Sequence, residues 1–289
     1  MKTDTKMAEG KTKVIWDAGD DEVLVESKDD ITAGDGAKHD LLEGKAVYST
    51  RTTSNCLEFL QAHGVETHFL GRVDARTFRA RNVQMIPIEL VARRIATGSY
   101  LKRRSDVVEG TIFDDLIVEF FEKDDPNHDP LVIIDQVGNR MLRFVASKPL
   151  GEGFMGEAPF SELWWCNPAH HQVPKLVAGL ADTTRMVFTM LERAWAEQAV
   201  ALVDLKIECG FDVASGNLLV ADVIDNDSWR IWPGGDKAEM KDKQVYRDLA
   251  GVDDPAAKAK ELGAIKKNYA WVAEATDAFT SIHYWPERD

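Results

Sequence analysis

The sequence predicts an α+β fold in two lobes, with a strand-rich N-terminal lobe over residues 1–86 and a mixed C-terminal lobe over residues 87–289. Three observations predict this fold. Short β-rich runs bounded by turn residues fill the first part of the chain, a long amphipathic helix lies in the second part, and a hairpin follows that helix. With 289 residues, 44% of them hydrophobic, the chain can bury a sizeable core.

The N-terminal lobe is expected to begin with a hairpin and a helix. Residues 13–28, KVIWDAGDDEVLVESK, form two β-rich runs around a Gly-Asp-Asp turn, which is typical of a hairpin. Residues 41–63 carry apolar side chains at helical spacing, and Gly64 supplies a stop for that helix. The segments THFLGRV (67–73) and TFRARNV (77–83) then return to a strand pattern.

Less regular segments follow. MIPIEL (85–90) has a proline inside an apolar run, and because proline has no N–H to donate, we expect an edge strand or a linker between the lobes. VARRIATGSYLKRR (91–104) is locally basic, so it can bind a phosphate, pair with acidic neighbours or be solvated.

Residues 131–174 show little periodicity and predict an irregular excursion. The GEGFMG within it (151–156) is flanked by neither a clear strand nor a clear helix, which argues against a dinucleotide site.

A helix over residues 173–199 is predicted to bury a core-facing stripe, because apolar residues and one threonine recur there at helical spacing: Val177, Leu180, Thr184, Val187, Leu191 and Trp195. The chain then enters VDLKIE (203–208), which alternates apolar and charged residues. In a strand, Asp204, Lys206 and Glu208 would share one face. A solvated outer face is the common explanation of such a pattern.

The segment after this strand favours a different explanation. The turn at 214–217 and the β-rich run at 218–232 predict an antiparallel hairpin, in which Asp222 can lie near Asp204 or Glu208. Carboxylates grouped on paired strands repel one another unless a cation is present. Oxygen ligands of this kind suit Mg²⁺ held together with nucleotide phosphates, which Lys206 can also contact. The charged face is therefore interpreted as a metal and phosphate face.

Composition excludes several classes of function. Lys plus Arg is 35 and Asp plus Glu is 49, and the resulting net charge of −14 disfavours non-specific binding to nucleic acid or anionic membranes. No apolar run reaches the roughly 18 residues of a membrane helix. The N-terminus lacks the apolar centre of a signal peptide, so a cytoplasmic location is expected. The three cysteines are far apart and indicate reduced thiols rather than disulfides or a zinc site.

Six spaced motifs cover most of the chain. They are EGKTK (9–13), SKDDITAGDGAK (27–38), MIPIELVARRIATGSYLKR (85–103), NHDP (127–130), LVDLKIECG (202–210) and ADVIDNDSWRIWP (221–233). In sequence and in order they resemble the motifs of the SAICAR synthetase family, the phosphoribosylaminoimidazole-succinocarboxamide synthases. They are most similar to the synthetase half of the bifunctional animal-type enzyme.

The resemblance implies an ATP-dependent ligase of purine biosynthesis that joins L-aspartate to carboxyaminoimidazole ribonucleotide through an acyl phosphate, with Mg²⁺ as cofactor and small molecules as partners. It implies an ATP cleft between the two lobes, and it leaves a homo-oligomer open. By match to the motifs, the implied residues are Lys206, Asp204 and Asp129 for catalysis; Gly10, Lys11, Lys13, Met85, Glu89 and Lys206 for ATP; Asp35, Arg93, Ser99 and Arg230 for the substrate; and Glu208 and Asp222 for the metal. We expect Lys13, Glu89, Lys206 and Asp222 to surround one cleft.

The sequence departs from the family at two places. Val223 stands where many bacterial members have Glu, which removes one carboxylate, and the 131–174 excursion is longer than its animal-type counterpart. Other functions stay open, namely another carboxylate-amine ligase on this fold or a nucleotide-binding module without catalysis. For Arg93, a structural ion pair with an acidic neighbour is the alternative to substrate binding.

Overall fold

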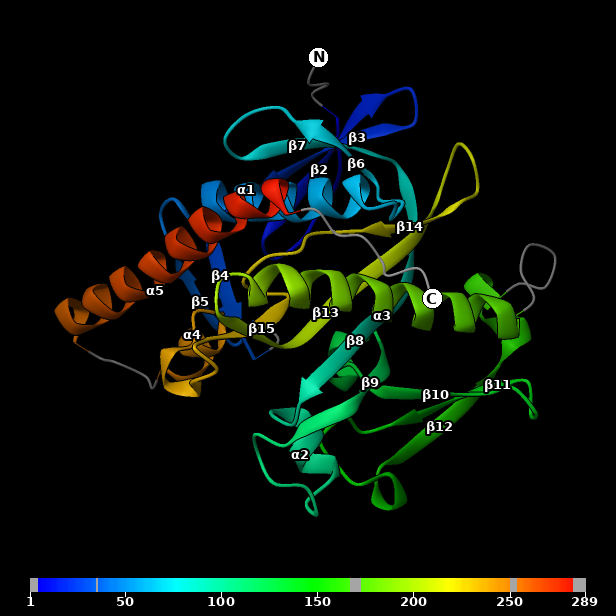
Figure 1. Ribbon diagram of the computed structural model, residues 1–289. Helices are drawn as coiled ribbons and strands as arrows, with labels where there is room; N and C mark the ends of the chain where they lie inside the picture. The colour runs from blue at the N-terminus through cyan, green and yellow to red at the C-terminus, as the bar shows by residue number, and fades with distance from the viewer. Residues whose placement is uncertain (1–4, 35, 167–172, 250–253, 283–289) are drawn as a thin grey trace. The chain divides into compact units, whose positions relative to one another are not determined.

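The computed structural model describes residues 5–34, 36–166, 173–249 and 254–282, which form two compact units (Figure 1). The first unit comprises Met1–Met85, Met190–Leu202 and Gly210–Asp289, and the second comprises Ile86–Thr189 and Val203–Cys209. The C-terminal residues group with the N-terminal strands because helix α5 (Pro255–Thr276) packs against helix α1 (Lys45–Ala62). The compact units are thus not contiguous in sequence, and the lobes expected over 1–86 and 87–289 stay a prediction.

The first unit contains a five-stranded antiparallel sheet in the order β1-β2-β3-β7-β6. The predicted hairpin is confirmed, since β2 and β3 pair from Lys13↔Ser27 to Gly19↔Glu22 around the turn at Asp20 and Asp21. The two later strands, β6 and β7, are confirmed as well. The strands are β1 (Lys6–Glu9), β2 (Lys13–Gly19), β3 (Glu22–Ser27), β6 (Phe69–Arg72) and β7 (Thr77–Arg81), and a separate hairpin is made by β4 (Asp30–Ala33) and β5 (Lys38–Leu41).

Helix α1 packs against strands of this sheet and against α5. It begins four residues later than the apolar pattern suggested, because Asp29 Oδ1 accepts the backbone N–H groups of Gly44 and Ala46 and so caps its first turn. It ends where predicted, and Gly64 adopts a φ of 88°, a conformation that glycine reaches without steric cost.

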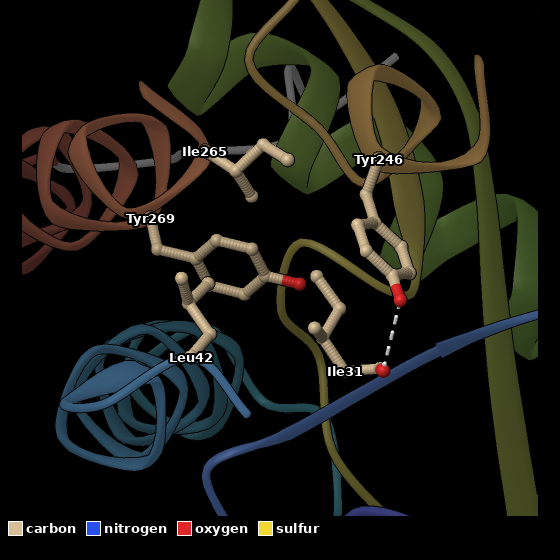
Figure 2. Packing of buried hydrophobic residues seen from close by; sticks show 5 residues of the cluster. All are labelled: Ile31, Leu42, Tyr246, Ile265 and Tyr269. Carbon is tan, nitrogen blue, oxygen red and sulfur yellow. Dashed lines mark hydrogen bonds between the residues drawn. The ribbon is translucent and has the colours of Figure 1, made fainter. Parts of the chain in front are cut away.

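One core cluster of the first unit joins the β4–β5 hairpin to the C-terminal helices, as Figure 2 shows. It consists of Ile31, Leu42, Tyr246, Ile265 and Tyr269, all at most 3% exposed. The Tyr246 hydroxyl reaches the Ile31 carbonyl oxygen at 3.3 Å and Asp40 Oδ2 at 2.9 Å, so its polar end is satisfied although the ring is buried. Tyr246 lies on α4 (Gln244–Asp248), which follows the 3₁₀ turn η5 (Lys237–Glu239).

An aromatic cluster buries the C-terminal end of helix α3 (Val173–Ala196) in the same unit. The Trp195 ring meets Trp229 at 5.3 Å and Phe279 at 5.1 Å edge-on, and stacks on Trp271 at 6.3 Å between centroids. These contacts fix β15 (Trp229–Pro233) and the final 3₁₀ turn η6 (Asp277–Ser281) to the helix. The predicted apolar stripe of α3 is buried throughout, which confirms the core interpretation.

The second unit is built on strands in the order β12-β11-β10-β9-β8-β13, of which β12 to β8 pair antiparallel. Its elements are β8 (Val83–Ile95), α2 (Ser99–Arg103), β9 (Ile112–Glu122), η1 (Asp125–Asn127), β10 (Leu131–Asp135), β11 (Arg140–Phe144), η2 (Leu150–Glu152), β12 (Phe154–Pro159), η3 (Phe160–Glu162), η4 (Trp164–Cys166) and the middle of β13 (Val200–Asp212).

Two expectations for this unit need correction. Pro87 does not lie on an edge strand, because β8 lies between β9 and β13. The boundary between the two compact units does fall in this segment, between Met85 and Ile86. Pairing of β8 with β9 begins at Ile88, one residue after Pro87, so the N–H that proline lacks is not needed for a bond to β9. The Pro87 carbonyl still accepts a bond from the Lys123 N–H at 3.0 Å.

The 131–174 segment is not irregular through its first part, since β10, β11 and β12 form a three-stranded meander. Its strands are too short to give a clear period in sequence.

GEGFMG forms the turn η2 and the start of β12, so it does not lead into a helix, as the sequence indicated. A strand, β11, does precede it, which the sequence did not indicate. The predicted C-terminal hairpin is confirmed for β13 and β14 (Leu218–Ala221), which are neighbours in the sheet and are closed by bonds between Asp212 and residues 216 and 217. β14 ends at Ala221, and β15 is a separate strand that also pairs with β13. A Cβ on Gly210 would lie 2.9 Å from the Gln84 carbonyl oxygen, so only glycine permits this close approach of β13 to β8.

Candidate active site

The charged face of β13 is buried rather than solvated. Asp204 and Glu208 are 5% and 4% exposed, and Lys206 between them is partly buried. The apolar residues Val203, Leu205 and Ile207 on the opposite face are also buried, so the strand is covered on both sides. Charged groups are rarely buried unless they are paired, and the partners of this face therefore define what it can do.

Lys206 and Glu208 belong to a chain of alternating charges in the second unit. Lys206 Nζ lies 2.6 Å from Glu89 Oε1 on β8 and 3.6 Å from Glu208 Oε1. The other oxygen of Glu208 is 2.7 Å from Nζ of Lys123, at the end of β9. Two cations thus compensate two carboxylates. Such pairing offsets the cost of burying the Glu208 carboxylate and places two ammonium groups beside it.

Arg93 forms the centre of a second buried network in the same unit. Its Nε lies 2.6 Å from Glu119 Oε2 and its Nη1 lies 2.9 Å from Asp204 Oδ2. Its Nη2 reaches Ser99 Oγ, at the start of α2, at 3.4 Å. Arg103 from the end of α2 also binds Glu119, and its Nη1 donates to the Ala146 carbonyl at 2.6 Å. The structure thus shows the ion pairs with acidic neighbours that were the alternative interpretation of Arg93.

In the first unit, Lys13 on β2 forms an ion pair with Asp222, which directly follows β14. Asp222 has a φ of 64°, in the left-handed region that non-glycine residues rarely occupy. Its carbonyl oxygen lies 3.1 Å from His68 Nε2. Burial, assisted by the nearby charge of Lys13, lowers the pKa of His68 to about 3. The ring is therefore neutral when it meets Asp222.

The loop between β14 and β15 carries two further carboxylates, the buried Asp225 and the partly buried Asp227. Asp227 accepts from Lys243 Nζ at 2.8 Å and from the Tyr269 hydroxyl at 2.7 Å. Burial opposes its ionisation, but the charges of Lys45 and Lys243 hold the pKa of Asp227 well below its ordinary value. Burial and the charge of Asp227 raise the pKa of Asp225. These contacts fix the loop that leads into the strand of Arg230.

The remaining predicted residues lie on loops and strand ends. Gly10 and the exposed Lys11 lie in the β1–β2 connection, where the Gly10 N–H donates to the Lys13 carbonyl at 2.9 Å. Met85 and Glu89 are half-buried on β8. Arg230 on β15 bonds Gln244 Oε1 at 3.3 Å.

Asp129 follows η1 with a φ of 48°, and its Oδ1 accepts from the Asp124 N–H at 2.8 Å. Asp35 lies outside the described residues.

The structure brings the predicted residues together in two groups, one in each unit. Lys13 meets Asp222 in the first unit, while Glu89, Lys206, Glu208 and the pair of Arg93 with Asp204 lie in the second. The expectation that Lys13, Glu89, Lys206 and Asp222 surround one cleft stays a prediction, because it concerns residues of both units.

Sequence reasoning missed five residues at these positions: Glu119, Arg103, Lys123, His68 and Asp227. One signal was present for Glu119, since it interrupts the apolar run LIVEFF of β9, where an unpaired charge would be costly. No comparable signal exists for Lys123, because a lysine at a strand end is normally solvated.

The carboxylates of Glu208 and Asp222 are the donor type that Mg²⁺ prefers. In the described part of the chain, no three His, Cys, Asp or Glu side chains are grouped closely enough to hold a metal by themselves. Mg²⁺ in nucleotide sites commonly takes only one or two protein carboxylates and completes its shell with phosphate and water. The residues therefore fit a metal that arrives with a nucleotide better than a resident metal held by protein alone.

Comparison with known proteins identifies the family. The sequence model of SAICAR synthetase matches residues 6–262. The chain belongs to the SAICAR synthetase family. A phosphoribosylaminoimidazole-succinocarboxamide synthase of Roseiflexus castenholzii is 43% identical over 283 residues, covering 97% of this chain and 100% of that protein. The bifunctional phosphoribosylaminoimidazole carboxylase/succinocarboxamide synthetase of Homo sapiens is 41% identical over 275 residues, covering 94% of this chain.

The chain matches only part of the length of its bifunctional relatives. It covers 58% of the human protein and 27% of the bifunctional purine synthesis protein purC/E of Dictyostelium discoideum. The family fold is also found among solved structures. A SAICAR synthetase in complex with ADP has a TM-score of 0.69 and 26% identity, covering 93% of this chain and 96% of that one. The predicted α+β class and the resemblance to this family, including the bifunctional animal enzyme, are confirmed.

None of the helices in the described ranges combines the length and the apolar character needed to cross a bilayer.

Proposed function

We propose that this chain is an ATP-dependent ligase that joins L-aspartate to carboxyaminoimidazole ribonucleotide, giving SAICAR, ADP and phosphate in purine biosynthesis. The observation that carries this function is the match of residues 6–262 to the SAICAR synthetase family. The full-length similarity to a succinocarboxamide synthase and the likeness to a SAICAR synthetase bound to ADP support it further.

The chemistry explains why ATP is needed. A carboxylate acylates an amine poorly because oxide is a bad leaving group. Transfer of the γ-phosphoryl group to a carboxylate oxygen of the ribonucleotide releases ADP and leaves an acyl phosphate. The aspartate amine then attacks the acyl carbon, the C–O bond to phosphate breaks, and the nitrogen loses a proton as the amide forms. The protein has to position the reactants and neutralise phosphate charge, and it needs no covalent nucleophile of its own.

For the nucleotide we propose Gly10, Lys11 and Lys13 from the first unit, and Met85, Glu89 and Lys206 from β8 and β13. Lys13 and Lys206 are ammonium groups already held by carboxylates, Asp222 for the first and Glu89 and Glu208 for the second. Each ammonium group can therefore turn toward a phosphate oxygen, and Glu208 keeps Lys123 as a second partner when Lys206 does so.

For Mg²⁺ we propose Glu208 and Asp222 as protein ligands. The ion would supply charge neutralisation to the phosphates when it is bound. Val223 contributes no side-chain oxygen next to Asp222, so the protein share of the shell is small and the nucleotide would supply the rest.

For the ribonucleotide and aspartate we propose Arg93, Ser99, Arg230 and Asp35 as binding residues. Asp204 and Asp129 are proposed to act in catalysis together with Lys206. Arg93 is held by Glu119 and Asp204 with Ser99 within reach of Nη2, which orients its guanidinium edge toward the start of α2. A fixed guanidinium of this kind suits a phosphate or carboxylate.

A coupled assay of ADP release tests the reaction. We expect ADP to form only when ATP, Mg²⁺, L-aspartate and carboxyaminoimidazole ribonucleotide are all present, and product analysis to show one SAICAR per ADP. ADP release with a different acid in place of L-aspartate would reassign the chain to another carboxylate-amine ligase. ATP binding without ADP release under any combination would leave only a nucleotide-binding module.

The partners proposed are small molecules only. The cytoplasmic location and a homo-oligomer stay predictions from the sequence, to be checked by cell fractionation and by light scattering of the purified chain.

A further inference from the structure

The backbone of Asp222 is held in an unusual conformation. Asp222 directly follows Ala221, the last residue of β14, and has a φ of 64°. The chain therefore leaves the strand by a left-handed turn. Aspartate tolerates this region better than most residues, but the conformation persists only when its surroundings fix it. The turn directs the side chain to Lys13.

His68 is the residue in contact with this turn. Its Nε2 lies 3.1 Å from the Asp222 carbonyl oxygen. A carbonyl oxygen can only accept, so the hydrogen of the ring is on Nε2 in this bond. The His68 side chain has only two rotatable bonds, so the position of its Nε2–H group is well defined. The Asp222 carbonyl oxygen can therefore accept this bond only from a narrow range of positions.

The backbone of His68 is fixed on both sides. Its N–H donates to the Val220 carbonyl on β14 at 2.9 Å, and its carbonyl accepts from the Arg81 N–H at 2.7 Å. The neighbouring Thr67 forms a parallel bridge with Val220. His68 is therefore anchored to the same strand whose exit it caps.

The side chain of His68 is 4% exposed and packs edge-on against Phe78, with ring centroids 5.7 Å apart. Phe78 packs in turn against Phe69. The ring has little freedom to move away from Asp222, because protein interiors leave few voids into which a ring can rotate.

From these contacts we infer that His68 is a positioning residue for Asp222. Its Nε2–H donates to the Asp222 carbonyl and fixes the left-handed turn from which the carboxylate points to Lys13. The inference rests on the proposed function in one respect, namely that Lys13 and Asp222 act on the nucleotide phosphates and Mg²⁺. His68 itself touches neither substrate nor metal in this assignment.

The test compares His68→Gln with His68→Asn. The glutamine amide nitrogen can occupy the place of Nε2, while the shorter asparagine amide ends near the place of Nδ1 and cannot reach the carbonyl. Loss of a residue that orients a ligand typically costs about 10- to 100-fold in activity or metal affinity. We expect that loss in kcat for His68→Asn, with KM for L-aspartate unchanged, and recovery of most of the activity in His68→Gln.

A second measurement does not depend on turnover. Calorimetric titration with ADP, with and without Mg²⁺, should show that Mg²⁺ strengthens ADP binding in the unaltered protein and in His68→Gln, and much less in His68→Asn. His63→Ala is the control, because it also removes a histidine bond to a backbone carbonyl, here that of Nδ1 to Phe59 at 2.7 Å on α1. It should leave both readouts unchanged.

The outcomes separate the two hypotheses when Asp222→Asn is measured in the same series. If Asp222→Asn abolishes turnover while His68→Asn retains it, His68 does not position Asp222 and only this inference fails. If Asp222→Asn turns over normally, the role proposed for Asp222 fails first. Equal losses in His68→Gln and His68→Asn, in proportion to a lowered melting temperature, would show that the ring only fills space.

Discussion

Two arginines of the second unit make the same kind of network in opposite environments. Arg93 bridges Glu119 and Asp204 from neighbouring strands, with its side chain 5% exposed and those of its partners 11% and 7%. Arg140 on β11 bridges Asp135 and Glu157 in the same way, with its side chain 42% exposed and theirs 24% and 47%. Equal geometry therefore does not mean equal energy, because only the first set of charges has been taken out of water.

The difference indicates what each network is for. An exposed ion pair gains little, since water and salt screen it. A buried pair repays its desolvation only when its geometry is good, and apolar residues of the same volume often stabilise as well or better. The Arg93 network is therefore a poor device for stability alone. Its Asp204 shares a face of β13 with Lys206 and Glu208, which is consistent with a role in binding, whereas the Arg140 network is an ordinary surface feature of the meander.

The largest effect is expected from Arg93→Met. This change leaves Glu119 and Asp204 buried with fewer counter-charges, which typically costs about 3 to 5 kcal/mol in the free energy of unfolding. Arg140→Met, the matched control, should cost less than about 1 kcal/mol. Urea denaturation of both variants checks the difference. Equal losses would show that burial does not separate the two networks.

The next largest effect concerns catalysis. Lys206→Met removes the ammonium group between Glu89 and Glu208, and loss of one group that stabilises transferring charge typically costs about 100- to 1,000-fold in kcat. The steady-state rate of ADP release measures this loss. Arg140→Met should keep the kcat of the unaltered chain. A Lys206→Met variant that is folded by circular dichroism and fully active would remove Lys206 from the catalytic residues.

Double-mutant cycles should give a smaller, more specific difference. The coupling energy between Arg93→Met and Asp204→Asn should be about 1 to 3 kcal/mol, because the two groups are in direct contact and buried. The coupling between Arg140→Met and Glu157→Gln should be about 0.2 to 1 kcal/mol. Denaturation in about 1 M salt should reduce the second value and leave the first nearly unchanged. Salt sensitivity of the Arg93 pair would contradict its buried position.

The smallest effect is expected in acid. A hydrogen bond from the Gly138 N–H, together with Arg140, lowers the pKa of Asp135 below its ordinary value of 3.8. As the pH falls below that value, the unfolded chain binds the proton before the folded chain does. The contribution of Asp135 to stability is thus present above the ordinary pKa and is lost as the pH falls through the lowered one. The difference in melting temperature between the unaltered chain and Asp135→Asn should therefore shrink from about pH 5 to about pH 2. A difference that grows with acidity would contradict the assigned shift.

Local patterns predicted the elements that are decided locally. The β2–β3 hairpin, α1 with its Gly64 stop, and the buried stripe of α3 follow from turn chemistry and from helical spacing, and the structure confirms each of them. The meander of β10 to β12 was missed because its strands are short and carry no clear alternation. Pro87 was misassigned because its compatibility with an inner strand depends on where pairing with β9 begins, and that is a property of the register.

In the candidate site, too, some features were predictable from local sequence and others were not. Sequence alone supplied the residue types and spacing that indicate phosphate chemistry, namely Lys13, Lys206, Glu208 and Asp222, because a motif can carry donor and acceptor types without any fold. It could not supply their partners. Glu119 and Lys123 come from β9, and His68 comes from a segment far from β14 in sequence, so their contacts exist only once strands distant in the chain are paired.

By itself, then, the sequence determined the fold class, the family and the kinds of group that act, since these depend on composition, periodicity and motif. Tertiary structure alone decided that the charged face of β13 is buried and which charges compensate it, because burial and ion pairing depend on distances between strands that no local pattern encodes. It also decided the left-handed turn at Asp222 and the histidine that holds it, since a strained φ persists only through contacts made by the rest of the fold.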